Sequence, residues 1–414
     1  MNWIYRFWLN IKIPIRNIWR NRKRTFTTIA SICVGTLTLL MASSYINMMF
    51  TGLKEQAIFH DYGHIQIAKK GYFQAEENSP DLMMNSNETA VLEKGLTKIE
   101  EVDFINKRFY MVGLIGNREH SSFFSAVAGL PESEALMSPN IKEGQALSDK
   151  DPYGVLIGRA LADKIKVGVG DTAMLFFSSA AGSQEAINVK VRGIYKALMK
   201  EQEQVVIYMP IQSAWDLSLD KSIHRVQVFL RPSDTPKTAE VAKKIQTFID
   251  ANHLNLEVKT WDQLAVFYKQ IVGMFTGMML VIGFILFLVV IFNISNTMVM
   301  AIHDRTREIG TLRAMGASRS EIVNLFLLEG IMIGIIGGLT GLMLASIFFP
   351  VINGMHITLP PGPGQDTPTP VIFHMTRPIV AVILIIDILT ALFASFFPAL
   401  RGSKTRIVRA LREV

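Results

Sequence analysis

The stretch "DRTREIGTLRAMGASRSE", residues 304–321, decides how the rest of the chain is organised, because it separates two long apolar runs. Residues 270–303 contain no Asp, Glu, Lys or Arg, and residues 322–352 contain Glu329 as their single charged side chain. A helix that crosses a bilayer needs about 20 predominantly apolar residues. The charged stretch is therefore predicted to be a short linker between two membrane helices.

Two further apolar runs bring the predicted number of membrane helices to four. Residues 25–53 carry no charged side chain, and residues 378–400 carry only Asp387. The composition agrees, with 50% hydrophobic residues, 19% charged residues and a mean hydropathy of +0.29. The first run follows a basic segment and is too long for a signal-peptide core, so we expect an uncleaved anchor. The predicted helices cover about 25–50, 271–302, 322–352 and 378–400.

The second run is longer than a membrane requires. As a helix, residues 270–303 would be about 51 Å long at about 1.5 Å per residue, against a hydrocarbon core of about 30 Å. We expect this helix to act as a rigid rod between the large segment before it and the linker after it.

Basic residues predict the orientation, because Lys and Arg concentrate on the cytoplasmic side of membrane helices. They cluster in residues 1–24, in the 303–321 linker and in the tail after residue 400, whereas loop 351–376 contains none. Both termini and the linker are therefore predicted to be cytoplasmic, and residues 51–270 external. The net charge of +7 follows from this topology and gives no reason to expect nucleic acid as a partner. The single cysteine, Cys33, lies in the first apolar run, so the external segment has no disulfide.

Residues 3–19 place apolar and aromatic side chains along one helical face. An amphipathic helix on the inner surface of the membrane fits this pattern, with its basic side chains toward lipid head groups. A helix packed against the rest of the protein is the alternative.

The external segment, residues 51–270, is predicted to form an α+β domain. It begins with a strand, a helix over 88–101 and further strands, and it ends with strands at 225–230 and 256–260 around a helix over 236–251. These two β-α-β units could fold together as a split ferredoxin-like unit. Residues 131–215 have the pattern of short strands and turns and are predicted to be an inserted β-rich subdomain.

Within the linker, three-residue spacing predicts an apolar ridge of Ile309, Leu312 and Met315, flanked by Arg305, Arg307 and Arg313. Gly316 is predicted to end this helix, and Ser318 or Ser320 to cap the next one, with Glu321 in its first turn. An ordinary amphipathic helix resting on lipid head groups is the alternative interpretation.

The third apolar run carries glycines at the spacing that lets helix backbones approach closely. They are Gly330, Gly334, Gly337, Gly338 and Gly341. Their partner could be another helix of this chain or a second subunit.

Two acids lie inside apolar runs. Glu329 could polarise a contact between helices, face the cytoplasmic end or be solvated at the interface. Asp387 lies near the predicted mid-bilayer, where an acid is costly, and is expected to bond inside the bundle to Asn293 or Asn296. The proline-rich loop 357–370 is expected to be extended, either as a connector or as the mouth between subunits.

Residues 294–341, "ISNTMVMAIHDRTREIGTLRAMGASRSEIVNLFLLEGIMIGIIGGLTG", resemble the core motif of the FtsX-like permease family, which includes MacB and the LolC/LolE lipoprotein-release subunits. The tail "PALRGSKTRIVRALREV" resembles the family's ending, and the order of one helix, a large external domain and three helices matches over essentially the whole chain. The resemblance implies an ABC transporter permease in the bacterial inner membrane.

The resemblance implies an FtsX-like permease domain over residues 271–414, and in this family the element between the second and third helices, here about 304–318, is a coupling helix that docks onto an ATP-hydrolysing subunit. The residues that match the motif here are Arg307, Glu308, Ile309, Gly310, Leu312, Arg313, Gly316 and Ala317. We expect Arg305, Met315 and Ser318 to belong to the same surface. The resemblance further implies a dimer of permeases, equal or homologous, in which ATP binding moves the external domains by mechanotransmission.

MacB itself carries a fused ATPase domain, but Gly-Lys does not occur in this sequence, so it has no P-loop. ATP and Mg²⁺ are therefore expected on a separate subunit, with no catalytic residue, cofactor or metal in this chain. Lipoprotein or lipid release, which could involve a periplasmic acceptor, is favoured over MacB-like export of drugs, peptides or toxins.

Two hypotheses of a different class compete with transport, namely a regulatory membrane protein and a membrane enzyme. His60 and His64 have a spacing that suits a metal only on a helix, and His64 is predicted to open a strand. The sequence therefore favours the transport component.

Overall fold

The computed structural model describes residues 22–75, 82–131, 140–148, 150–178, 184–197, 200–218, 221–359 and 369–404. The predicted N-terminal amphipathic helix, most of the proline-rich loop and the end of the tail lie outside these ranges. The chain divides into a helical unit (residues 1–50, 271–358 and 370–414) and a sheet unit (residues 51–270 and 359–369).

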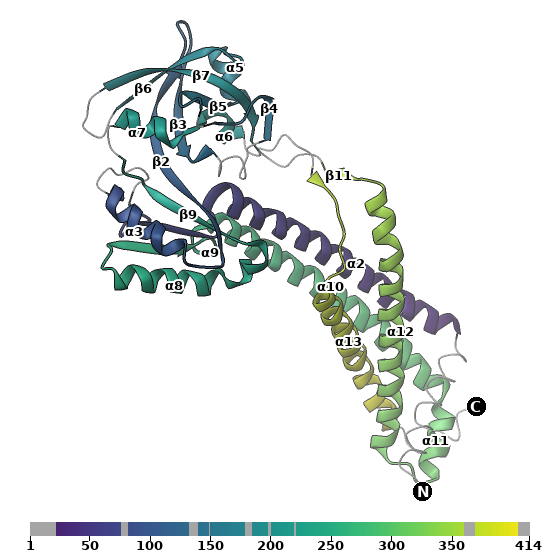
Figure 1. Cartoon of the computed structure of the whole chain (residues 1–414). Coiled ribbons are helices and arrows are strands. Elements are labelled where there is room, and N and C mark those ends of the chain that lie inside the picture. Colours follow the sequence, from purple (N-terminus) through teal and green to yellow (C-terminus); the bar gives the residue numbers. More distant parts are fainter. Residues whose placement is uncertain are drawn as a thin grey trace. The chain divides into compact units, whose positions relative to one another are not determined.

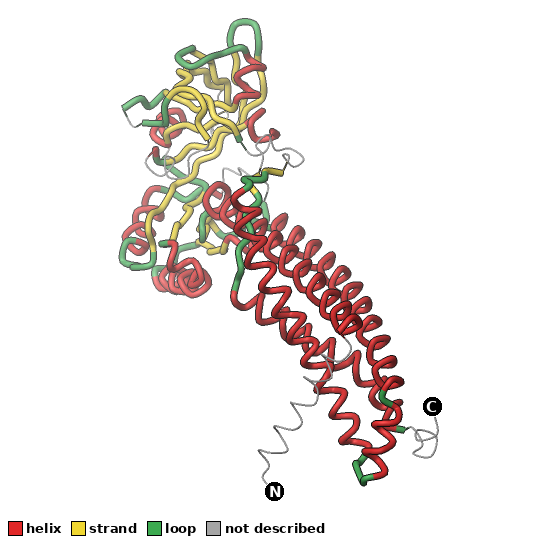
Figure 2. The backbone as a smooth tube through the Cα atoms, turned by 90° about the vertical axis from the view of Figure 1, so that its right-hand side faces the viewer, coloured by secondary structure: helices red, strands yellow, loops and turns green. Residues whose placement is uncertain are grey.

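The helical unit is built from four long helices that lie side by side (Figures 1 and 2). They are α2 (Arg22–Gln56), α10 (Val266–Asp304), α12 (Arg319–Gly354) and α13 (Arg377–Ser403). Each is long and apolar enough to cross a membrane by length and composition. The four predicted helices are therefore confirmed as helices, each extending beyond its predicted bounds.

The glycines of α12 face helices of the same chain. A Cβ added at Gly337 would lie 2.7 Å from Ile32 of α2, and one at Gly341 would lie 2.6 Å from Cβ of Thr36. On the other side, a Cβ at Gly334 would lie 2.8 Å from Cβ of Ala391 of α13. Because these approaches leave no room for a larger side chain, α12 packs tightly between α2 and α13. The partner of these glycines, left open by the sequence, is thus found within the chain.

Among the residues that the structure describes, no such packing covers most of α10. Its buried side chains are confined to its C-terminal part, where Ile294, Met298 and Ile302 enter the helical core. Large apolar side chains before this part, such as Leu280, Phe284 and Phe292, are exposed. This apolar surface suits lipid or another membrane helix.

The first part of the sheet unit is an antiparallel sheet with the strand order β10-β1-β9-β2. Its strands are β1 (Ile65–Lys69), β2 (Val102–Gly116), β9 (Arg225–Leu230) and β10 (Leu256–Thr260). Helix α3 (Ser86–Leu96) connects β1 to β2, and α8 (Thr238–Ala251) connects β9 to β10 after the 3₁₀ turn η3 (Pro232–Lys237). Alternate strand residues and one face of each helix form the core, for example Ile65, Val228, Leu92 and Ile245.

Strand β2 is long enough to belong to two parts of the sheet, and Figure 1 shows it running from one to the other. From Phe109 onward it pairs with β3 (Ser121–Gly129), and from Gly113 also with β6 (Thr172–Ser178). The second part continues through β8 (Val206–Pro210), β5 (Gly154–Gly158), β7 (Gln184–Lys196) and β4 (Asn140–Gly144). Residues 109–129 thus lie in this β-rich part, which starts earlier than the predicted residue 131.

Short elements complete the chain. In the sheet unit they are the π-helix η1 (Ala57–Tyr62), α5 (Arg159–Ile165), α6 (Lys200–Val205), α7 (Ile211–Ser218) and α9 (Trp261–Leu264). Two-residue strands β11 (Thr358–Leu359) and β12 (Thr369–Pro370) lie at the two ends of the proline-rich loop.

The face of the first sheet opposite α3 and α8 carries buried polar side chains. Arg108 Nε donates to Gln227 Oε1 at 2.7 Å, and Gln227 Nε2 donates to the carbonyl oxygen of Asp61 in η1 at 2.7 Å. His64 Nδ1 accepts the Leu230 N–H at 3.1 Å, and burial lowers the pKa of this imidazole to about 4. His64 Nε2 lies 3.0 Å from Oγ1 of Thr235, so both ring nitrogens are hydrogen-bonded within the fold, which favours a structural role over metal binding.

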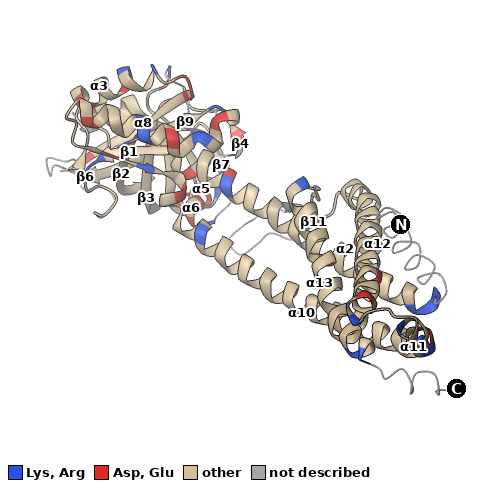
Figure 3. Ribbon diagram, turned by 90° about the horizontal axis from the view of Figure 1, so that it is seen from below, with Lys and Arg blue, Asp and Glu red and all other residues tan. Residues whose placement is uncertain are grey.

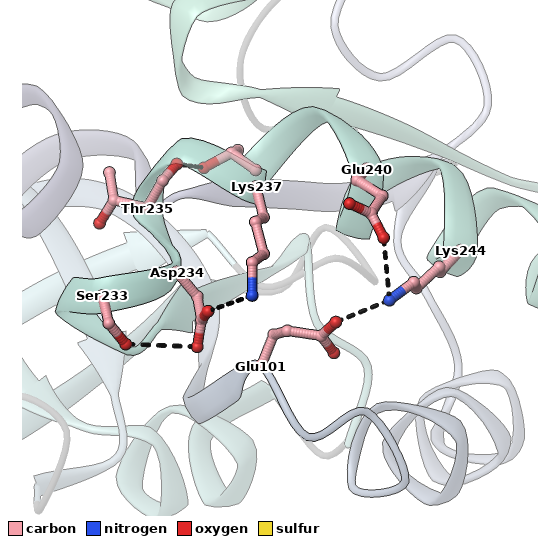
Figure 4. A network of polar contacts seen from close by, with 8 residues as sticks. Glu101, Ser233, Asp234, Thr235, Lys237, Glu240 and Lys244 are labelled. Atoms are coloured by element: carbon pink, nitrogen blue, oxygen red, sulfur yellow. Dashed lines mark hydrogen bonds and ion pairs between the residues drawn. The ribbon is translucent and has the colours of Figure 1, made fainter.

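Exposed polar contacts tie the start of β2 to α8, and further contacts lie within η3 (Figure 4). Lys244 Nζ lies 2.6 Å from Glu101 Oε1 and 3.3 Å from Glu240 Oε1, and Lys237 Nζ lies 2.9 Å from Asp234 Oδ1. The hydrogen bond from Lys244 lowers the pKa of Glu101. Because ion pairs at a solvated surface contribute little to stability, this network is a minor support of the fold.

Candidate functional site: a coupling helix at the end of the bundle

The linker forms the short helix α11 (Thr306–Ala314) between α10 and α12. Figure 3 shows charged residues gathered at and near α11, whereas the ribbons of the long helices beside it carry few charged residues along their length. The candidate site is the surface of α11 together with the contacts that hold it to the long helices.

Local hydrogen bonds end α11 where the sequence predicts. Gly316 has a φ of +100°, which glycine tolerates without strain. The Ala317 N–H donates to the Leu312 carbonyl oxygen at 3.0 Å and the Gly316 N–H to that of Arg313 at 3.1 Å, the two bonds of a Schellman motif. Ser318 then caps α12, because its Oγ accepts the Glu321 N–H at 3.3 Å and Glu321 Oε2 accepts the Ser318 N–H at 2.9 Å. The predicted stop and cap are confirmed, with Ser318 rather than Ser320 as the cap.

The predicted apolar ridge does not exist as one surface. Ile309 is 3% exposed and packs in the helical core with Ile322 and Phe326, whereas Leu312 is 38% exposed and Met315 72% exposed. A helix turns about 100° per residue, so three residues spaced by three spread over about 120° of its circumference. The ridge prediction is wrong for Ile309, which faces the bundle, as does the buried Gly310.

The prediction that Arg305 flanks the partner surface is also wrong. Arg305 is buried at 4% exposure, and its Nη1 lies 3.0 Å from Oε2 of Glu329 in α12. Its Nη2 lies 3.4 Å from Oε1 of the same carboxylate, so the pair is bidentate. Of the interpretations left open for Glu329, the structure shows the contact between helices.

Of the other two arginines predicted to flank the ridge, one contacts the long helices and one is exposed. Arg313 Nη1 donates to the carbonyl oxygen of Ser403, at the C-terminal end of α13, at 3.0 Å. Arg307 is exposed. The face of α11 that remains accessible combines an apolar pair with polar and charged neighbours; its residues are Arg307, Glu308, Thr311, Leu312, Ala314 and Met315.

Contacts that the sequence analysis missed join the ends of the long helices near α11. Arg24 Nη1 of α2 lies 2.6 Å from Asp304 Oδ2 of α10, and the hydroxyls of Thr28 and Thr297 lie 2.8 Å apart. The basic residues before the first membrane helix indicated orientation, but no local pattern linked Arg24 to Asp304.

The partner predicted for Asp387 is wrong. Asp387 Oδ2 lies 2.8 Å from Oγ1 of Thr36 in α2, whereas Asn296 is exposed. The absent side chain of Gly338 makes room for the acid, because a Cβ there would lie 3.1 Å from Asp387 Oδ2. Asp387 thus bonds inside the bundle, as expected, but between α13 and α2.

We predict that Asp387→Asn is tolerated and that Asp387→Leu is not. The amide keeps a hydrogen bond to Thr36, whereas leucine leaves the hydroxyl without this partner and adds bulk beside Gly338, which together should cost about 1–3 kcal/mol. Thermal unfolding of the detergent-purified protein measures the difference. Equal unfolding temperatures for Asp387→Leu and the unchanged protein would show that this contact is incidental.

Comparison with known proteins agrees with this architecture. Residues 25–248 match the model of the MacB-like periplasmic core domain, and residues 280–407 match the model of the FtsX-like permease C-terminal domain. The chain therefore belongs to the family of ABC transporter permeases that combine these two domains.

Three similar proteins illustrate the range of the family. An uncharacterized ABC transporter permease of Methanocaldococcus jannaschii is 24% identical over 97% of this chain and 97% of its own length. The lipoprotein-releasing system transmembrane protein LolC of Xylella fastidiosa (strain 9a5c) is 23% identical over 72% of this chain and 75% of its own length. The macrolide export ATP-binding/permease protein MacB of Mannheimia succiniciproducens is 31% identical, but over only 30% of this chain and 20% of its own length.

Among solved structures, the periplasmic region of MacB from Actinobacillus actinomycetemcomitans matches 53% of this chain and 95% of its own chain. Its identity is 12% and its TM-score is 0.39.

Proposed function

We propose that this chain is the permease subunit of an ABC transporter and that α11 is its coupling helix. A separate ATPase subunit binds ATP and Mg²⁺, and its motion reaches the external domain through α11 and the long helices. The observation that carries this proposal is the division of α11 into two faces. One face is tied to α12 and α13 through Arg305 and Arg313, and the other exposes Leu312 and Met315 among charged residues. An exposed apolar pair with a charged rim is typical of a protein interface.

The substrate that we propose lies outside the cytoplasm or in the outer leaflet, and release of a lipoprotein or lipid is favoured. The match to LolC of Xylella fastidiosa supports this choice, because it covers 72% of this chain, whereas the match to MacB of Mannheimia succiniciproducens covers 30% of it. Export of a drug, peptide or toxin is the alternative. We further interpret the β10-β1-β9-β2 sheet with α3 and α8 as a ferredoxin-like unit, since two β-α-β segments supply it.

The assembly that we propose contains two permeases, equal or homologous, in a bacterial inner membrane. The exposed apolar side chains of α10 supply a surface for the second permease or for lipid. The permease itself has no catalytic role in this proposal.

Both termini and α11 should face the cytoplasm, because the basic residues cluster there. In a Cys33→Ala background, a membrane-impermeant thiol reagent added to intact cells should label Glu185→Cys in the external domain and leave Ser318→Cys unlabelled. Both positions are exposed in the structure, so accessibility to the reagent reports sidedness. Labelling of Ser318→Cys from outside would contradict this topology.

Co-purification tests the function itself. The affinity-tagged chain, solubilised from its native membrane, should retain an ABC ATPase recognisable by its P-loop peptide, and the complex should hydrolyse ATP. The chain purified alone should show no hydrolysis. Hydrolysis by the chain alone, or a membrane complex that contains no ATPase, would refute the assignment.

A further inference from the structure

A buried ion pair joins Arg305, at the start of α11, to Glu329 of α12. The two side chains are 4% and 6% exposed and make two close contacts, at 3.0 and 3.4 Å. Arg305 directly precedes α11, whereas Glu329 lies well inside α12, beside Gly330 of the tightly packed glycine face. The pair thus connects the start of α11 to the helix that packs against both α2 and α13.

Stability alone does not account for a buried pair at this place. Apolar side chains of similar volume often stabilise a protein as well as a buried ion pair does, because both charges must be removed from water. Separating two buried charges is costly, so a buried ion pair can hold two helices in one relative orientation. A small cavity lined by Arg24, Thr25 and Thr297 borders the pair, so the arginine and the carboxylate have space on one side.

We propose that Arg305 and Glu329 are positioning residues that make α11 and α12 move as one body. Displacement of α11 by the ATPase is then transmitted to α12 and, through its glycine contacts, to α2 and α13. This inference rests on the proposed coupling function. It assigns the transfer of movement from α11 to α12 to two buried side chains that lie away from the accessible face of α11.

The neighbouring contacts play different roles. The pair Arg24–Asp304 joins α2 to α10 without including α11, and its side chains are 46% and 40% exposed, so solvent weakens it. Arg313 ties the other end of α11 to α13, but through a neutral carbonyl oxygen. Loss of Arg24–Asp304 should therefore change coupling little, which makes Asp304→Asn a matched control.

The test uses the complete complex with the ATPase that co-purifies. The central variant is the double substitution Arg305→Met/Glu329→Leu, which removes both charges and keeps an apolar contact. The second is the exchange Arg305→Glu/Glu329→Arg, which keeps an ion pair. Three quantities are measured for each: the unfolding temperature, the amount of ATPase recovered, and the change in amide hydrogen exchange of α12 on adding ATP with vanadate.

We expect the apolar double variant to unfold within a few degrees of the unchanged protein and to recover the same amount of ATPase. In this apolar variant, the change in amide hydrogen exchange of α12 on adding ATP with vanadate should be lost. The variant Arg305→Glu/Glu329→Arg, which keeps an ion pair, should show at least part of that change. Asp304→Asn should behave as the unchanged protein does.

Three results would overturn the inference. A full nucleotide response in the apolar double variant would show that packing alone transmits the motion. Loss of ATPase recovery in that variant would show that the pair shapes the docking surface instead. If Arg305→Met/Glu329→Leu does not fold, the variant Arg305→Glu/Glu329→Arg decides the question. Absence of the nucleotide-dependent change in hydrogen exchange of α12 in that variant would then contradict the proposal. If the unchanged protein recovers no ATPase, it is the proposed function that fails.

Discussion

Leu312→Asp should abolish recovery of the ATPase and all transport while the permease still folds and enters the membrane. Leu312 is 38% exposed on the free face of α11, so the bundle does not depend on it. In a docked complex, however, the aspartate would become a buried charge without a partner. Truncation of a central interface residue costs about 2 kcal/mol or more, roughly a thirty-fold loss of affinity, and a buried charge adds to this.

Pull-down of the ATPase by the tagged permease measures this loss, with membrane insertion and unfolding temperature measured in parallel. Val169→Asp is the matched control, because it introduces the same charge at a 42% exposed apolar residue of the sheet unit. Leu312→Met should keep docking. Normal ATPase recovery by Leu312→Asp would mean that α11 is a membrane-surface helix and does not couple.

Gly341→Leu should strongly destabilise the helical bundle. A Cβ at this position would lie 2.6 Å from Cβ of Thr36 and 2.9 Å from the carbonyl oxygen of Cys33. A backbone carbonyl cannot rotate away, so α2 and α12 must separate and lose the contacts around them. Overpacking of this kind costs about 1–3 kcal/mol and occasionally more.

Thermal unfolding and the yield of monodisperse protein in detergent measure the effect. Gly354→Leu, at the end of the same helix, is the control, because a Cβ there meets nothing within 4 Å in the described part of the chain. Equal stability of Gly341→Leu and Gly354→Leu would show that α12 does not pack closely on α2 in the folded protein.

The sequence determined the features that short windows of residues encode. Uninterrupted apolar runs identified the four long helices, because a membrane helix depends on the hydropathy of its own residues. Gly316, Ser318 and Glu321 predicted where α11 ends and α12 begins, because caps are made by hydrogen bonds between close neighbours in the chain.

Only the tertiary structure decided which side chains meet. Strand β2 belongs to two parts of the sheet because its first half pairs with β9 and its second half with β3. The spacing of apolar residues within the strand does not show which other strands pair with it. Ile309 faces the bundle while Leu312 stays exposed, Arg305 pairs with Glu329, and Thr36 bonds to Asp387. These contacts depend on how whole helices pack, because residues far apart in the chain become neighbours only when α12 approaches α2 and α13 at its glycines.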